Sequence, residues 1–504
     1  MNGKRYGMRV GLVLMSSALL VAMGTGLTAA KTTGPALHIP KLRWKGTITM
    51  YAQAYSPVAP GVKLKKGAIR LTAFGALAKQ FEHLYPGIKI SFVEPFNDTN
   101  QSVETKAAGG TMLDVYWNQY GSWNAVFPPG IVYNLDPYFN QPNPYIPGNK
   151  KWKDVMSARV LQQTVNPTNG AHYELDADWV GTAFYYNKRL FAKAGITAPP
   201  KTWTQLITDA KRLTAHHIIA GADIPMYYGW WARLFLGNDL GLKTLTQLEK
   251  WSKARYAVTA LGEVIGYKKG VLNPATNPRI IGWWPLVKQL YHYFDPNVTD
   301  IPWNNVPAGA QTGSALFGAG KVAMVYQGSW LPNEIKAAGA KFPLGSFPFP
   351  TASLHSVYKF ATNVNSAADV GGPSAAYQFG ISTPRADQSM RQPGKFQAVL
   401  DWLRFIGTPQ HVQAVVNQLG EFVPTLKGTK PVPSEAGAAL PKGAQYASIQ
   451  GFDDVTNQAA TEIGNVWQEY LGGHLSFAAA KQQYDAAVRQ AVQQYIATNH
   501  PHIP

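Results

Sequence analysis

Residues 70–92 read RLTAFGALAKQFEHLYPGIKISF, and the hydrophobic pattern changes its period within them. Apolar side chains recur every three or four positions across residues 70–84, which predicts an amphipathic helix. Pro86 and Gly87 end that helix, and Ile88–Phe92 then alternates apolar and polar side chains as a half-buried strand does. Strand-like stretches flank this unit, GTITMY at residues 46–51 and LDVYW at residues 113–117. The alternation of strands with helices predicts an α/β fold with a parallel sheet.

Amphipathic helices are also predicted in the second half of the chain. Ser and Thr at a helix start accept hydrogen bonds from backbone N–H groups that the helix leaves unpaired. Thr202, Thr408 and Ser476 stand at such positions, and Gln205 completes a capping box with Thr202. Residues 395–406 carry a further apolar stripe and predict a helix directly before Thr408.

The composition describes a large, basic, globular protein. The chain has 504 residues, of which 46% are hydrophobic, enough for two or three domains with sizeable cores. Lys and Arg number 46 against 28 Asp and Glu, so the net charge is +18 at pH 7. The basic residues are scattered rather than clustered, which argues against nucleic-acid binding. An acidic habitat, in which carboxylates titrate, is one hypothesis for the shortage of acids.

The N-terminus is typical of an exported protein. Residues 1–30 combine a basic start, an apolar run at residues 10–27 and small residues up to Ala30, which predicts a secretory signal cleaved near Ala30. Residues 31–45 then form a leader. The apolar run could also span a bilayer, so an uncleaved membrane anchor is the alternative. The chain has no Cys, so we expect a periplasmic or cell-surface protein that is not a lipoprotein and has no disulfide.

No catalytic motif is complete. Residues 317–324 read FGAGKVAM, and a phosphate-binding loop would need Gly in place of Ala315 and Ser or Thr in place of Val322. Neither G-x-S-x-G nor H-E-x-x-H occurs. The adjacent residues 216–217 are both His and predict a solvated helix end, and residues 295–300 lack the Gly of a calcium loop. We therefore expect no catalytic residue, no metal and no cofactor.

Three acidic residues alternate at Glu174, Asp176 and Asp178. On a strand this spacing puts all three on one face. Solvated edge residues are the simplest interpretation of the pattern. The alternatives are acceptors for the hydroxyl groups of a ligand, or a catalytic carboxylate pair of the kind that glycoside hydrolases use.

Tryptophan and tyrosine gather beside polar residues at the ends of several predicted segments. A flat aromatic ring can lie against the C–H face of a sugar, while Asp, Asn and Ser bind the hydroxyl groups, and ligands of parallel α/β sheets bind at strand carboxyl ends. For the set as a whole, this pattern favours carbohydrate recognition over core filling. The residues concerned are Trp117, Asn118, Trp123, Asp178, Trp179, Tyr227, Tyr228, Trp230, Trp231, Trp283, Trp284, Ser329 and Trp330.

Four stretches, taken in order, resemble one known family. They are YYNKRLF at 185–191 with AGI at 194–196 and PPKTW at 199–203, FGAGKVAM at 317–324 with GSW at 328–330, the helix pair at 395–419 with FVP at 422–424, and residues 467–480. The chain resembles the extracellular solute-binding proteins of ABC transporters, in the sugar-binding family that includes maltose-binding protein. The resemblance covers essentially all of the chain after the predicted signal.

This resemblance implies the type II periplasmic-binding-protein fold, in which two discontinuous α/β lobes are joined by hinge strands and move like a Venus flytrap. The stretch at 317–324 then becomes a helix end and a crossing strand. The expected crossings lie near residues 181–187, 322–327 and 377–383. The expected lobes are residues 46–182 with 327–376 for the first, and residues 187–321 with 383–504 for the second.

The resemblance also implies a function. A sugar or oligosaccharide would bind between the lobes, the lobes would close on it, and the protein, expected to be a monomer, would pass it unchanged to permease subunits in the membrane. A non-sugar solute such as a glycerol phosphate is the alternative, and a secreted glycoside hydrolase is a less favoured one. The expected ligand contacts are Trp330, Ser329, Trp179, Trp230, Trp231, Asp178, Trp117 and Asn118, with Trp330 first because the GSW turn matches a family position that faces the cleft.

Overall fold

The structure is a computed structural model of the whole chain. The residues that it describes are 39–504 except 65, 95, 98–99, 119–129, 168, 223–227, 296–311, 351–355, 358, 361–367, 370, 374, 435–436, 440–445, 448 and 450. The predicted signal peptide at residues 1–30 lies outside the described residues, as do Trp123, Tyr227 and residues 296–300 of the calcium-like stretch.

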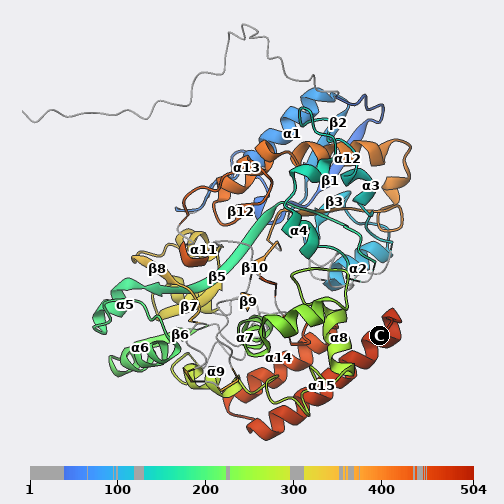
Figure 1. The fold of residues 1–504 in the computed structure, drawn as a ribbon. Helices are drawn as coiled ribbons and strands as arrows, with labels where there is room; N and C mark the ends of the chain where they lie inside the picture. The colour runs from blue at the N-terminus through green and yellow to red at the C-terminus, as the bar shows by residue number, and fades with distance from the viewer. Residues whose placement is uncertain are drawn as a thin grey trace, which may run out of the picture.

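A five-stranded sheet forms the centre of the first lobe, at the top of Figure 1. Its strands, in the order β2-β1-β3-β11-β4, are β2 (Ile88–Phe92), β1 (Gly46–Met50), β3 (Val115–Trp117), β11 (Gln378–Ile381) and β4 (Leu175–Asp176). β1 pairs in parallel with β2 and β3, which confirms the parallel unit expected from the sequence. The late strand β11 pairs antiparallel with β3 and with β4.

Helices from both ends of the chain pack on this sheet. They are α1 (Ala73–Leu84), α2 (Asn100–Ala108), α3 (Asp136–Phe139), α4 (Ala158–Gln163), α12 (Lys395–Ile406) and α13 (Pro409–Leu419). The ring of Phe81 on α1 lies with its centroid 5.3 Å from that of Trp402 on α12. Gln418 on α13 accepts hydrogen bonds from the backbone N–H groups of Thr72 and Ala73, at the start of α1. These contacts join α12 and α13 to the first lobe.

A second sheet has the order β10-β5-β7-β6, and β8 and β12 also pair with β5. Its strands are β5 (Asp178–Asn187), β6 (Ile219–Ala222), β7 (Val322–Gly328), β8 (Leu344–Phe347), β10 (Gly371–Gly372) and β12 (Val423–Pro424). Two further short strands, β9 (Ala368–Asp369) and β13 (Tyr446–Ala447), pair only with each other among the described residues. β7 is the strand expected after FGAGKV, and the short helix α10 (Gly313–Gly318) comes directly before it.

The second lobe has a large aromatic core under a layer of helices. Its helices besides α10 are α5 (Lys188–Lys193), α6 (Trp203–Ala215), α7 (Tyr228–Glu249), α8 (Ala260–Lys268), α9 (Trp284–Tyr291), α11 (Leu331–Ala337), α14 (Asn457–Gly472) and α15 (Phe477–Asn499). The rings of Phe235 and Trp283 stack with centroids 5.1 Å apart, and Trp284 lies 5.0 Å from Trp467. Trp283 and Trp284 therefore fill the core instead of contributing to a site.

β5 passes from one lobe to the other. Asp178 and Trp179, at its start, pair with β12, which follows α13 of the first lobe. Residues 182–187 pair with β7 and β8 of the second lobe. The crossing expected near residues 181–187 lies within this strand, and Figure 1 shows β5 running between the two groups of elements.

The packing of two segments differs from the expected lobe boundaries. Residues 383–504 were expected in the second lobe, but α12 and α13 pack on α1. Residues 327–376 were expected in the first lobe, but α11 packs against α10, and β8 pairs with the far end of β5. An amphipathic pattern shows that one face of a helix is buried, but it does not show which sheet covers that face.

Candidate ligand-binding site at the junction of the lobes

An aromatic group lies where β7 ends. Trp330 lies two residues after the end of β7, and its ring centroid lies 5.9 Å from that of Trp230 on α7, edge to face. Trp230 also lies 6.2 Å from Tyr326 of β7. The half-buried Trp330 packs against the core of the first lobe, whereas Trp230 packs against the core of the second. This pair of indoles therefore connects the two lobes.

The backbone at the end of β7 fixes where the Trp330 ring lies. A Cβ atom added at Gly328 would lie 2.1 Å from the Trp330 ring, so the ring rests directly on that glycine. Ser329, between them, donates its backbone N–H to the carbonyl oxygen of Gly181 at 2.9 Å. The GSW turn thus ties the indole to the crossing strand β5.

Asp178 is fully buried at the start of β5. Its Oδ2 accepts hydrogen bonds from the Tyr55 hydroxyl at 2.6 Å and from the Ala376 N–H at 3.2 Å. Its Oδ1 has no hydrogen-bond partner within the described protein. Burial raises the pKa of Asp178 to about 6. The carboxyl group keeps one free oxygen that can accept a hydrogen bond.

Trp179 and Ser329 carry further buried polar atoms without a protein partner. Trp179 is 6% exposed and its indole Nε1 makes no hydrogen bond to the described residues. The Ser329 hydroxyl, in a residue 1% exposed, is in the same situation. Gly328 faces Thr182 across the ladder of β5 and β7, so the two residues lie near each other on neighbouring strands.

Trp117 and Asn118 stand at the carboxyl end of β3. The Trp117 indole donates to the carbonyl oxygen of Ala375 at 3.0 Å. The Asn118 amide nitrogen donates to a Glu174 carboxylate oxygen at 3.2 Å, while its Oδ1 has no partner among the described residues. Gln378 on the neighbouring strand donates to Asp176 Oδ1 at 2.7 Å. The end of the first sheet therefore holds a buried set of amides and carboxyl groups.

The simplest interpretation of Glu174, Asp176 and Asp178, as solvated edge residues, is wrong. All three side chains are buried. The stretch is also not one strand, because Ala177 separates β4 from β5 and donates its N–H to the carbonyl oxygen of Tyr377. Burial raises the pKa of Asp176.

Trp231 contacts Tyr326 of the aromatic group but is buried in the core of the second lobe. It is 1% exposed, and its ring packs 5.8 Å from Phe349 and 5.9 Å from Tyr326 in the core of the second lobe. Adjacent residues of a helix point in different directions, so Trp231 faces the core while Trp230 faces Trp330. The structure makes Trp231 a core residue, in contrast to the contact expected from the sequence.

Three residues of the junction were not expected from the sequence. They are Tyr55, which bonds Asp178, Tyr326, whose hydroxyl lies 2.6 Å from that of Thr182, and Gln378, which bonds Asp176. Each is joined to its partner across more than 100 positions of the chain. No local pattern marks such pairs.

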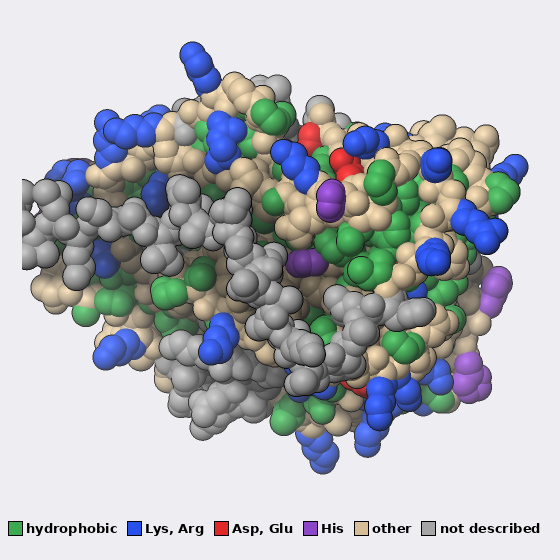
Figure 2. All heavy atoms as spheres, turned by 90° about the horizontal axis from the view of Figure 1, so that it is seen from above, with side chains coloured by type: hydrophobic (Ala, Val, Ile, Leu, Met, Phe, Trp, Pro, Cys, Tyr) green, Lys and Arg blue, Asp and Glu red, His purple; other side chains and the backbone are tan. Residues whose placement is uncertain are grey.

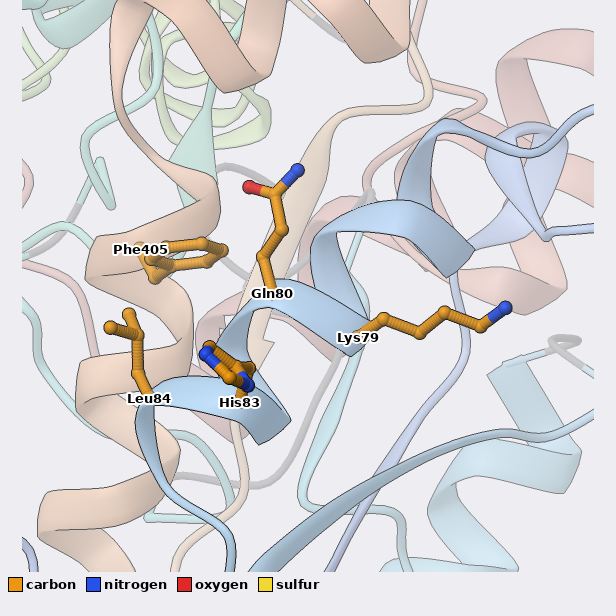
Figure 3. Close-up of a pocket in the computed structure, with 5 residues that line it drawn as sticks. All are labelled: Lys79, Gln80, His83, Leu84 and Phe405. Carbon is orange, nitrogen blue, oxygen red and sulfur yellow. The ribbon is translucent and has the colours of Figure 1, made fainter. Parts of the chain in front are cut away.

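A separate depression lies between α1 and α12 of the first lobe (Figure 3). Lys79, Gln80, His83 and Leu84 of α1 line it together with Phe405 of α12, and none of the expected ligand contacts is among them. Among the described residues, no three His, Asp or Glu side chains are grouped as metal ligands. No helix among the residues that the structure describes is both long and apolar enough to cross a bilayer.

Comparisons with known proteins agree with this architecture. A protein of Brucella abortus (strain 2308), named as a candidate binding protein, is 28% identical over 300 residues, 58% of this chain and 63% of its own length. The matched stretch thus spans less than two thirds of that curated relative. An uncharacterised ABC transporter extracellular-binding protein of Pyrococcus horikoshii is 25% identical over 445 residues, 79% of this chain and 85% of its own.

The fold and the family follow from two further matches. The solved structure of a chitin oligosaccharide binding protein shares the fold with a TM-score of 0.57 at 20% identity, covering 89% of this chain and 99% of that one. The family model of the bacterial extracellular solute-binding proteins matches residues 68–380, which is more than half of the chain. With its two α/β lobes joined through β5, the chain belongs to the bacterial extracellular solute-binding proteins.

Proposed function

We propose that the protein binds a sugar or oligosaccharide where its lobes meet and delivers it, unchanged, to the membrane permease of an ABC transporter. The observation that carries this proposal is the aromatic group of Trp230, Tyr326 and Trp330. One indole packs on each lobe, and their centroids are 5.9 Å apart. Aromatic faces of this kind suit the apolar C–H face of a sugar ring, and binding there would hold the lobes together.

Buried polar atoms near the crossing strand support a ligand rich in hydroxyl groups. Asn118 Oδ1, Asp178 Oδ1, the Ser329 hydroxyl and Trp179 Nε1 all lack a partner within the described protein. A buried polar atom left unpaired costs about 1–3 kcal/mol, so a partner at these positions stabilises the complex. Hydroxyl groups can serve both kinds of atom, because they donate to the oxygens and accept from the indole N–H.

The charges at the junction disfavour a phosphorylated solute. The described residues assigned to the site include the carboxyl group of Asp178 and no Lys or Arg. Phosphate recognition relies on cationic side chains or on clustered N–H donors. A glycerol phosphate would therefore meet a carboxyl group where it needs a cation.

Two of the comparisons support the proposal further. A solved structure that shares the fold is named for a chitin oligosaccharide, and the Pyrococcus relative is named for an ABC transporter. Relatives and fold are those of binding proteins rather than enzymes. We accordingly expect the ligand to leave the protein with its bonds intact.

Trp330→Ala tests the proposal directly. It removes the indole that packs on the first lobe, and we expect sugar binding measured by calorimetry to be lost while the unfolding curve keeps its cooperativity. Trp44→Ala is the matched control. Trp44, just before β1, is also half-buried and packs on the first lobe, and its indole donates a hydrogen bond to Gln392. Unchanged affinity in Trp330→Ala would contradict the proposed role of this residue.

A further inference from the structure

The lobes touch at a second place, away from the ladder of β5. Arg159, on α4 of the first lobe, places its guanidinium group 3.5 Å from the ring centroid of Tyr256 in the second lobe. Gln163, also on α4, donates its side-chain N–H to the carbonyl oxygen of Tyr256 at 2.8 Å. Two side chains of one short helix therefore hold the same residue of the other lobe.

Backbone hydrogen bonds reinforce this contact. The N–H of Arg255 donates to the carbonyl oxygen of Gln162 at 2.8 Å, and that of Lys253 donates to the carbonyl oxygen of Pro167 at 2.9 Å. A small apolar cluster joins the same two segments, with Val165 from one and Ala254 and Ala257 from the other. We name residues 159–167 and 253–257 together the lobe clasp.

Each half of the lobe clasp is anchored in its own lobe. On the first side, Leu161 packs against the first-lobe core, and its carbonyl oxygen bonds Nε2 of His172 at 2.8 Å. On the second side, Leu248 and Val258 flank the segment and belong to the second-lobe core. A movement of one lobe relative to the other must therefore act on the clasp.

The clasp is also connected to the floor of the candidate site. The Thr164 hydroxyl donates to the carbonyl oxygen of Val160 at 3.0 Å and lies close enough to Asp176 to favour its charged form, and Asp176 accepts the 2.7 Å hydrogen bond from Gln378. Tyr256 holds a backbone φ of +59°, which residues other than glycine rarely adopt. Figure 1 shows α4 and α8 on one side of β5, and β8 on its other side.

We propose that the lobe clasp is a latch that holds the lobes in the arrangement seen here and parts when they separate. The proposal rests on the proposed function for its purpose, since a ligand held between lobes can leave only when they part. The chain continues through β5 and keeps the lobes joined, whereas the clasp consists of non-covalent contacts that separation breaks. Its strength sets the ratio of closed to open protein in the absence of ligand.

The test measures the distance between the lobes without any ligand. Spin labels on Lys79→Cys in α1 and Lys211→Cys in α6 report this distance in a chain that has no other cysteine. Tyr256→Ala should give a longer and broader distance distribution, with a two- to thirtyfold shift toward open protein, about the strength of one cation–π contact. Tyr256→Phe keeps the ring and should behave as the unaltered protein does.

Lys288→Ala is the matched control. Lys288 lies 4.4 Å from the ring centroid of Tyr470, and both residues belong to the second lobe. Its loss should leave the distance distribution unchanged. Arg159→Gln removes the same cation–π contact from the first lobe and decides the test if Tyr256→Ala fails to fold.

Distance distributions equal to that of the unaltered protein in both Tyr256→Ala and Arg159→Gln would overturn the latch. Because this readout needs no sugar, it stays valid if no sugar binds and the proposed function fails. If a sugar does bind, Tyr256→Ala should also release it faster, by a factor similar to the shift in the ligand-free ratio.

Discussion

At the scale of single residues, the position of the Trp330 indole at the junction of the lobes depends on Gly328. The Trp330 ring lies on Gly328, and any side chain at that position would take the space of the ring. The sequence indicated Trp330, Ser329 and Trp230 as a set, because aromatic and polar residues meet there at segment ends. It could not separate Trp230 from the buried Trp231, because their difference arises from the direction in which α7 presents each ring.

We predict that Gly328→Ala weakens sugar binding at least tenfold. The added methyl group would displace the Trp330 indole from β7, while Gly328 has an ordinary strand conformation that Ala can adopt. Calorimetry of the purified variant measures the affinity. Gly464→Ala is the control, because a Cβ there meets no atom within 4 Å. Equal affinities for Gly328→Ala and Gly464→Ala would show that sugar binding does not depend on the position of the Trp330 indole over Gly328.

At the scale of elements, helix boundaries were predictable and their packing partners were not. The sequence predicted α12 at residues 395–406 and the start of α13 at Thr408, and the structure has both, with the Thr408 hydroxyl accepting from the His411 N–H. Caps and apolar stripes are local signals, so they can be read from a short window. Their attachment to the first lobe depends on long-range contacts such as that between Gln418 and the start of α1.

A buried ion pair is one such contact, and it should be costly to break. Lys395 Nζ, at the start of α12, lies 2.7 Å from Asp114 Oδ1 beside β3, and both side chains are at most 5% exposed. Lys395→Met would leave the carboxylate without its cation, and we expect the free energy of unfolding to fall by about 3–5 kcal/mol. Urea unfolding measures this loss.

The double variant Lys395→Met with Asp114→Asn is the control for that prediction. It removes both charges, so much of the lost stability should return. A Lys395→Met variant as stable as the unaltered protein would show that α12 does not depend on this pair.

At the scale of the whole molecule, the basic surface reflects both the shortage of acids and the burial of several of them. Figure 2 shows Lys and Arg spread over the upper face of the first lobe, with few Asp and Glu among them. Several acids are buried instead, including Asp114, Asp176, Asp178, Asp401 and Glu421. The composition showed the shortage of acids, but not that several of them are buried.

We predict that the protein is more stable near pH 5 than near pH 8. Burial raises the pKa of Asp178 and of Asp401 to about 6 and that of Glu421 to about 8. Between pH 4 and these values the folded state holds protons that the unfolded chain has lost, so the free energy of unfolding falls as the pH rises. At about 1.36 kcal/mol per pKa unit, shifts of this size are worth on the order of 3 kcal/mol each for Asp178 and Asp401 and about 5 kcal/mol for Glu421.

Urea midpoints at pH 5 and pH 8 measure this dependence. Asp136 acts in the opposite sense, because its hydrogen bond with His172 outweighs its burial and lowers its pKa, but this matters only below about pH 4. A stability that peaks near neutrality and collapses below pH 4 would contradict both this prediction and the hypothesis of an acidic habitat.

The central claim is that the lobes bind a sugar and release it intact. Residues 31–504 should be titrated with mono- and oligosaccharides, with glycerol phosphate and a polyamine as controls, while Trp fluorescence and the melting temperature are recorded. We predict a saturable change in both signals with one class of sugar, and mass spectrometry should recover that sugar unaltered. No response to any sugar, or recovery of a hydrolysed product, would contradict it.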